Sequence, residues 1–142
     1  MHTFASSASD DEIRAAVVDW SELLAEKRYA EALGMFPPAE AEMTPAELGK
    51  WIAEYGSPEP FPDGRVFAVT SLRGQPDFQR IVDRIDVNRA DLFGLDPTQY
   101  VGMVHYDGVP LNGLPSDLTA RFHIKKVVAD RITLEFLDIH VM

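Results

Sequence analysis

The chain has 142 residues, of which 46% are hydrophobic and 10% aromatic, so it is long and apolar enough to fold as one domain and is not an intrinsically disordered segment. Its net charge of −10 disfavours nucleic acid as a partner, because a phosphate backbone requires a basic surface. It has no cysteine, no apolar run near the ~20 residues of a membrane span and no signal-peptide pattern at its start, so we expect a cytoplasmic protein that does not bind a membrane.

The acidic residues gather in the first half of the chain. Residues 1–64 hold 13 acidic and four basic side chains, whereas residues 65–142 hold ten acidic and nine basic ones. This asymmetry has two interpretations: a solvated acidic surface that keeps the protein soluble, or a surface that binds a basic protein partner.

Two capping motifs predict where helices begin. Ser9 with Glu12, and Thr44 with Glu47, are capping boxes, in which a hydroxyl accepts a hydrogen bond from the backbone N–H three residues on. Pro45 suits a first helical turn, because its missing N–H would have no partner there. Apolar residues at helical spacing follow each cap: Ile13, Ala16, Val17, Trp20, Leu23 and Leu24 in the first helix, and Leu48, Trp51, Ile52 and Tyr55 in the second.

A further apolar pattern at helical spacing precedes Pro37 and Pro38, so the first 36 residues contain either one bent helix or two short ones. Its members are Tyr29, Ala32, Leu33 and Phe36. We expect residues 1–8 to be flexible, Gly56 to end the later helix, and the proline-spaced stretch 57–64 to cross over to a sheet.

The middle of the chain is less regular. Residues 65–72 predict a first strand and residues 73–77 a turn. Residues 78–88 fit both a helix and a strand, and their density of isoleucine and valine favours a strand. Residues 89–98 predict a loop whose apolar side chains fold inward, namely Leu92, Phe93 and Leu95.

Three consecutive strands are predicted over 99–107, 117–127 and 132–140, because apolar and polar residues alternate with a period of two. The short connection 128–131 predicts a tight antiparallel hairpin. This hairpin brings Phe122 near Phe136, and Ile124 near Leu134, on one buried face. From Leu137 onward the alternation changes sides, which indicates a β-bulge or a change of the covering layer.

Residues 17–36, which read Val-Val-Asp-Trp-Ser-Glu-Leu-Leu-Ala-Glu-Lys-Arg-Tyr-Ala-Glu-Ala-Leu-Gly-Met-Phe, are similar to the opening of the nuclear transport factor 2-like superfamily. Residues 110–122, Pro-Leu-Asn-Gly-Leu-Pro-Ser-Asp-Leu-Thr-Ala-Arg-Phe, resemble a segment of uncharacterised bacterial members. This superfamily also contains SnoaL-type cyclases and ketosteroid isomerases.

The resemblance implies one α+β domain over residues 1–142, with N-terminal helices packed on a curved, mainly antiparallel sheet. It also implies a cone enclosing a small apolar pocket and a homodimer formed through the sheet, but it does not imply an activity. The chain departs from the superfamily at residues 37–43, which do not read as a strand although members commonly have one before the third helix.

His105 with Asp107, and His140 with Asp138, are the candidate catalytic pairs. Each pair has i, i+2 spacing, which places both side chains on one face of a strand, where a carboxylate can orient an imidazole that acts as a general base. The two pairs flank the 117–127 strand at ~10 Å, which is too far for shared metal ligation.

The facing of His105 is open. If Val101, Met103 and His105 face the core, His105 lines a pocket; if Tyr100, Val104 and Tyr106 do, Tyr106 lines it. Tyr106 would then donate to a substrate carbonyl, as tyrosines do in the isomerases of the superfamily that the chain resembles.

Aromatic side chains on the predicted helices and on the last strand are the candidate ligand-binding residues: Trp20, Tyr29, Trp51, Tyr55 and Phe136. Arg121, His123 and Lys125 form a cationic row on the opposite face of their strand, where they are solvated or contact a dimer partner. The sequence contains no cofactor-binding or metal-binding motif.

These features predict a small ligand-binding or interaction domain, and the sequence demonstrates no catalysis. One alternative is a pocket enzyme, an isomerase, dehydratase or cyclase that transfers a proton on a small apolar carbonyl compound. In that enzyme His140 or His105 is the base and Tyr106 the donor. Another alternative is an acidic, immunity-type protein that binds a basic protein partner.

Overall fold

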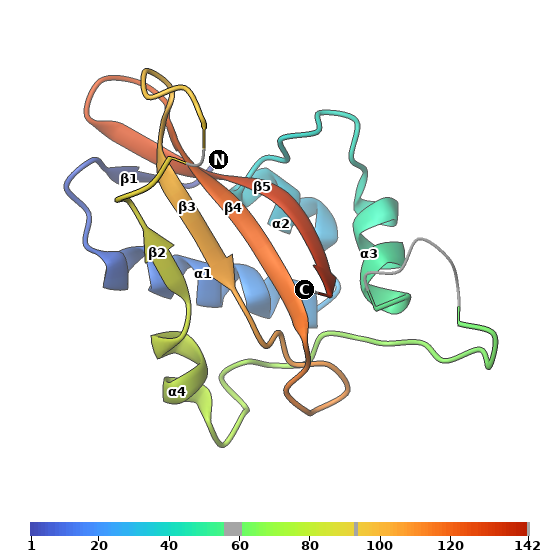
Figure 1. Ribbon diagram of the computed structural model, residues 1–142. Coiled ribbons are helices and arrows are strands. Elements are labelled where there is room, and N and C mark those ends of the chain that lie inside the picture. Colours follow the sequence, from blue (N-terminus) through green and yellow to red (C-terminus); the bar gives the residue numbers. More distant parts are fainter. Residues whose placement is uncertain (56–60, 93, 142) are drawn as a thin grey trace.

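A five-stranded antiparallel sheet forms the framework of the computed structural model, which describes residues 1–55, 61–92 and 94–141 (Figure 1). The strand order is β1-β5-β4-β3-β2. The strands are β1 (Thr3–Ala5), β2 (Asp86–Asn88), β3 (Tyr100–Tyr106), β4 (Leu118–Lys126) and β5 (Arg131–Val141). The helices are α1 (Asp10–Ala25), α2 (Tyr29–Met35), α3 (Pro45–Ala53) and α4 (Phe78–Asp83). The predicted α+β class with a curved antiparallel sheet is therefore confirmed.

The hydrophobic core lies between the sheet and the helices α1 and α2, which run behind it in Figure 1. Trp20 of α1 and Phe36, directly after α2, contact the Phe122 ring of β4 at centroid distances of 4.9 and 5.6 Å. Phe136 of β5 lies 5.3 Å from Trp20, and all four side chains are fully buried. These contacts fix which face of the sheet is internal.

The β4–β5 hairpin has the predicted register, with Phe122 opposite Phe136 and Ile124 opposite Leu134. Its turn is closed by the Arg131 amide, which donates to the Val128 carbonyl at 3.0 Å. The register shifts by one residue beyond Phe136, so that Arg121 pairs with Asp138. The irregularity predicted at Leu137 is thus a β-bulge.

Both predicted helix caps are confirmed. The Glu12 amide donates to Ser9 Oγ, and the Glu47 amide donates to Thr44 Oγ1, each at 3.2 Å. The apolar residues before Pro37 form two helices, α1 and α2, and not one bent helix. The chain turns between them at Lys27, whose φ of 58° interrupts helical geometry. Within the described residues, no helix is both long and apolar enough to cross a membrane.

The strand predicted over 65–72 was wrong. Its described backbone bonds to loops instead: the Ala68 amide donates to the Asn112 side chain at 3.1 Å and the Thr70 amide to the Pro110 carbonyl at 3.0 Å. One isolated β-bridge, between Val69 and Leu111, is the only strand-like pairing among the described residues of this segment. The segment therefore covers the end of the sheet without joining it.

Residues 78–88 contain a helix followed by a strand, so the strand prediction holds only for β2 at its end. The start of the chain also differs from expectation, because β1 lies within the stretch predicted to be flexible and pairs with Arg131–Thr133 of β5. Gly56, Phe93 and the first part of the 57–64 crossover lie outside the described residues. Residues 37–43 contain no strand, as expected, but Pro38 bridges Phe136.

Candidate functional site

The uncovered face of the sheet carries most of the candidate catalytic side chains. We call the side opposite α1 and α2 the outer face. Along β4, Phe122 and Ile124 point to the core, so the alternate residues, such as Arg121 and His123, point outward. By strand pairing, the outer face comprises Asp86, Asn88, Tyr100, Met103, His105, Thr119, Arg121, His123, Lys125, Thr133, Glu135, Asp138 and His140.

One polar row crosses four strands of this face. Asp86 lies opposite His105, His105 opposite Arg121, and Arg121 opposite Asp138. Arg121 donates to both oxygens of Asp138, at 2.9 Å from Nε and 2.5 Å from Nη2. This fork-to-fork pair raises the pKa of the Arg121 guanidinium. His140 Nδ1 lies 3.2 Å from the same carboxylate, so Asp138 contacts both Arg121 and His140.

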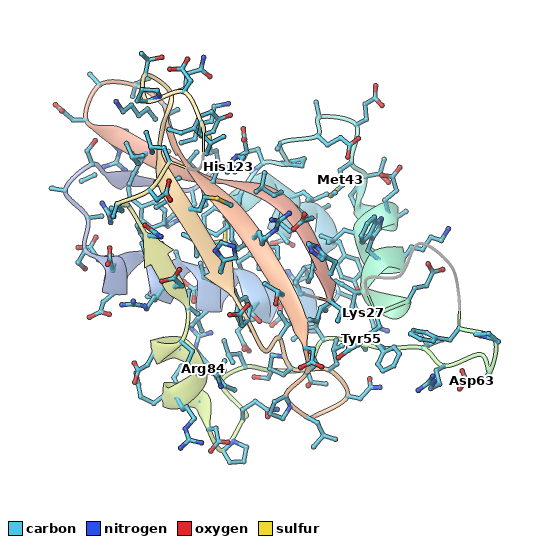
Figure 2. All side chains as sticks on the ribbon, viewed as in Figure 1. Lys27, Met43, Tyr55, Asp63, Arg84 and His123 are labelled. Carbon is cyan, nitrogen blue, oxygen red and sulfur yellow. The ribbon has the colours of Figure 1, made fainter. Side chains whose placement is uncertain are left out.

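A second cluster surrounds Glu135. Its carboxylate lies 3.1 Å from Lys125 Nζ, 3.3 Å from His123 Nδ1 and 3.2 Å from the Tyr100 hydroxyl. Burial opposes the ionisation of Glu135, but these hydrogen bonds outweigh burial and lower the pKa of its carboxyl group. Figure 2 shows His123 above β4, where this cluster lies. The β4 and β5 part of the outer face thus carries a connected set of ion pairs.

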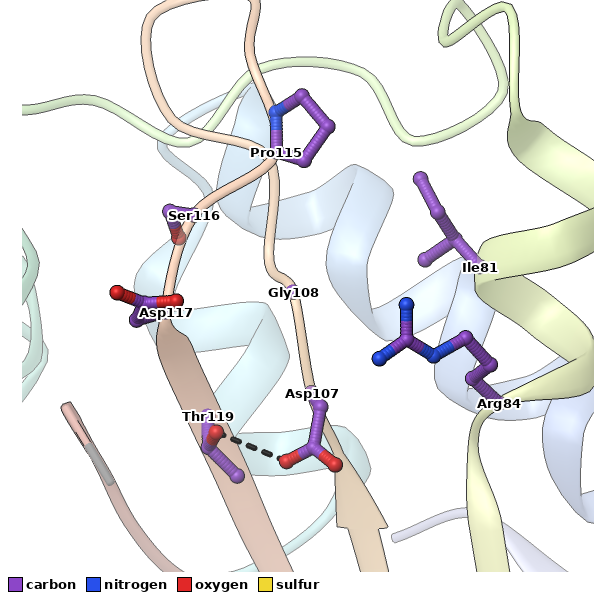
Figure 3. Close-up of a pocket in the computed structure, with 8 residues that line it drawn as sticks. All are labelled: Ile81, Arg84, Asp107, Gly108, Pro115, Ser116, Asp117 and Thr119. Carbon is purple, nitrogen blue, oxygen red and sulfur yellow. Dashed lines mark hydrogen bonds between the residues drawn. The ribbon is translucent and has the colours of Figure 1, made fainter.

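A pocket opens at one end of the outer face, where α4, β3 and β4 meet (Figure 3). Its volume is about 400 Å³. It is lined by Ile81, Arg84, Asp107, Gly108, Pro115, Ser116, Asp117 and Thr119, and we call it the Arg84 pocket. The buried Thr119 hydroxyl donates to the Asp107 carboxylate at 2.9 Å, which fixes that carboxylate at the rim.

The structure brings the two predicted His–Asp pairs onto the same side of the sheet. His105 lies on β3 and His140 on β5, with β4 between them, as the sequence predicted. Asp107, however, bonds to Thr119 and not to His105, whereas Asp138 does lie beside His140. Asp107 is the one member of these pairs that lines the Arg84 pocket.

Tyr106 lies on the other side of the sheet. It is fully buried, and its hydroxyl is 2.8 Å from the buried Ser21 hydroxyl of α1. Burial raises the pKa of the Tyr106 phenol. Of the second facing considered for the sequence, the structure has Val104 and Tyr106 inward and His105 outward. Tyr100, expected inward with them, lies instead on the outer face, because the register shifts between Tyr100 and Gly102. The proposed donor and the two histidines therefore do not face one substrate.

None of the aromatic ligand-binding candidates lines the Arg84 pocket. Trp20 and Phe136 belong to the core, and Tyr29 is half-buried with its ring against Gly49. Trp51 is 36% exposed on α3. Tyr55, labelled beside α3 in Figure 2, has its ring tilted against Phe67 at a centroid distance of 4.8 Å, and its hydroxyl accepts a hydrogen bond from the Asp117 amide.

The sequence did not indicate Arg84 or Thr119 as site residues. Arg84 belongs to residues 78–88, which were predicted to be a strand, so the sequence did not indicate that Arg84 directly follows a helix. Thr119 does follow from the alternation of β4, which places it outward beside the end of β3. Among the described residues, no cluster of three histidine, aspartate or glutamate side chains is arranged to hold a metal ion.

Comparisons with protein-family models, with curated proteins and with solved structures found no match to this chain.

Proposed function

We propose that the chain is an interaction domain whose outer face binds a basic protein partner. The observation that carries this proposal is the set of half-buried ion pairs on the sheet face opposite α1 and α2 (Figure 1). Side chains held in ion pairs before binding lose little further freedom on binding, which favours recognition by a rigid polar surface.

The charge of this face supports a cationic partner. Glu135 and Asp138 already contact cations of the same face, whereas Asp86 and Asp107 form no ion pair with a described residue. Asp86 lies opposite His105 on β2, and Asp107 follows His105 by two residues, directly after β3. A lysine or arginine of the partner would find two available carboxylates there.

Core packing supports a protein partner over a small apolar substrate. The nuclear transport factor 2-like resemblance implies a conical pocket between sheet and helices, and membership of that superfamily remains a proposal supported by helices packed on a curved sheet. In this chain Trp20, Phe122 and Phe136 occupy that position in mutual ring contact. A substrate chamber would require these side chains to separate, at the cost of several core contacts.

The resemblance also implies a homodimer through the sheet, which would cover the same outer face. Sedimentation of the purified chain therefore comes first, because a dimer that buries Arg121 would compete with a partner. A cytoplasmic location, which suits a cysteine-free chain, belongs to the same proposal.

The test uses deca-lysine as a cationic probe and amide NMR shifts as the readout. We expect shifts to gather on β2, β3 and β4, and to disappear in ~0.5 M NaCl, where the screening length falls to roughly 4 Å. The double variant Asp86→Asn/Asp107→Asn should weaken binding at least ~fivefold, because it removes two unpaired carboxylates.

The matched control is the double variant Glu40→Gln/Glu42→Gln, which removes two exposed acidic charges from the acidic first half of the chain. This control should bind the probe within ~twofold of the parent chain. Equal weakening by both double variants would refute the outer face as the docking surface and would favour general attraction to the acidic chain.

A further inference from the structure

We propose that the Arg84 pocket binds a basic α-amino acid, such as free lysine or arginine. This site shares Asp107 with the proposed docking surface, but it also uses Arg84, on which that docking does not depend. Its volume of about 400 Å³ falls in the range of roughly 300–1,000 Å³ that is usual for small-molecule sites. The pocket is therefore large enough to enclose a ligand of this size.

The pocket lining carries opposite charges that do not neutralise each other. Arg84 follows the last residue of α4, and its guanidinium reaches toward the junction of β3 and β4 in Figure 3. It forms no ion pair with any described residue. Asp107 faces the same space from the end of β3 and has only the Thr119 hydroxyl as its partner. A gap between two such groups is suited to a ligand that carries both charges.

The chemistry of an amino acid matches this lining. A guanidinium binds a carboxylate through two parallel hydrogen bonds, so Arg84 would hold the α-carboxylate. Asp107, positioned by Thr119, would accept from the α-ammonium group. The Gly108 amide donates to no described residue and lies in the same lining, so it offers the carboxylate a further donor.

A second carboxylate in the pocket, that of Asp117, determines which class of amino-acid side chain fits. Asp117 also lines the pocket and is exposed, and its carboxylate makes no ion pair with a described residue. Two carboxylates and one guanidinium complement two cations and one anion, which is the charge pattern of lysine and arginine at neutral pH. Acidic amino acids would place a second carboxylate against Asp117 and should be excluded.

The experiment is an amide NMR titration of the full chain with L-lysine, L-leucine and L-glutamate. We expect saturable shifts at Gly108 and Thr119 with lysine, at least ~tenfold weaker binding of leucine, and none of glutamate. Lysinamide lacks the carboxylate and Nα-acetyl-lysine lacks the α-ammonium, so each should bind at least ~tenfold more weakly than lysine.

Variants assign the two contacts. Arg84→Gln should reduce lysine affinity at least ~tenfold and make lysine and lysinamide bind equally. Asp107→Asn should also reduce lysine affinity at least ~tenfold, and it should make lysine and Nα-acetyl-lysine bind equally. Arg80→Gln removes a similar charge one turn earlier on α4, outside the pocket, and should leave affinity unchanged.

Three results would overturn the assignment: no saturable shift up to ~10 mM lysine, equal affinity for leucine and lysine, or binding that survives both Arg84→Gln and Asp107→Asn. Asp107 is common to the two proposals, whereas Asp86 belongs only to the docking surface and Arg84 only to the pocket. The effects of Asp86→Asn on deca-lysine binding and of Arg84→Gln on lysine binding therefore distinguish failure of one proposal from failure of the other.

Discussion

Replacing Tyr106 by phenylalanine removes one hydroxyl from the core and leaves the Ser21 hydroxyl without its partner. Both groups are fully buried, with 2.8 Å between their oxygens. A buried hydroxyl left unpaired costs about 1–3 kcal/mol, and Tyr106→Phe should lower the free energy of unfolding by that amount. The lower end applies if the Ser21 hydroxyl turns to a carbonyl of its own helix.

A double-mutant cycle isolates the pair. Ser21→Ala leaves the phenol unpaired and should cost a similar ~1–3 kcal/mol, whereas the double variant leaves no unpaired group. The double variant should therefore be at least about 1 kcal/mol more stable than the sum of the two single effects predicts. Urea unfolding followed by the fluorescence of the buried Trp20 measures all four proteins.

Additive single effects would refute the reasoning, because they would mean that the two hydroxyls do not depend on each other. A neutral Tyr106→Phe variant with a normal m-value would refute it as well. That result would show that the phenol is not required by the core, and it would reopen a chemical role for Tyr106.

Three further perturbations test other parts of the structure. Gly102→Ala should destabilise the sheet by ~2 kcal/mol or more, because φ is 153° and a Cβ would lie 2.1 Å from the Asn88 carbonyl oxygen. Glu22→Gln should weaken the turn at 71–73, whose two amides and hydroxyl donate to this carboxylate at 2.7–3.1 Å. The expected loss is ~1.5–3 kcal/mol, with faster amide exchange in the turn. Because the Glu135 pKa is lowered in the folded state, its stabilising contribution is complete above about pH 4.5 and is lost as pH falls through the folded-state pKa. Glu135→Gln should flatten the acid limb of stability against pH.

Each of these has a clear contrary result. A Gly102→Ala chain as stable as the parent would mean that β2 can move away from β3 at no cost. Unchanged amide exchange at 71–73 in the Glu22→Gln chain would show that the turn stands without its anchor. A parallel acid limb in the Glu135→Gln chain would mean that other carboxylates dominate acid unfolding.

The hairpin of β4 and β5 was predictable because alternation reports burial directly. Phe122 and Phe136 lie on the inner face, and the break at Leu137 marks the bulge. The caps at Ser9 and Thr44 were predictable because capping depends on a few adjacent residues. Local signals of this kind need no knowledge of the rest of the chain.

The errors lie where distant contacts decide the structure. Residues 65–72 have strand-like composition, but the amides of Ala68 and Thr70 bond to the distant loop at 110–112. β1 has three residues and exists through its pairing with β5. Residues 78–88 satisfy both periods because a helical turn and a strand share them.

The site was predictable in part. The placement of His105 and His140 on either side of β4 followed from strand order. The facing of His105 did not, because the long connection from β3 to β4 does not fix the register of β3 against the hairpin. The Arg84 pocket was not predictable, since it requires the position of α4 against the end of the sheet.

The bulge in β5 makes one position of this strand tolerant to a change in length. Leu137 is the extra residue between the pairs Phe122–Phe136 and Arg121–Asp138. Deleting it would give an unbroken strand in which Asp138 and Ile139 still face outward and inward, as they do now. The same deletion elsewhere in β5 would exchange the core and outer faces of every residue beyond it. Among relatives of this chain, a one-residue gap should therefore fall at this point of the strand more readily than at its neighbours.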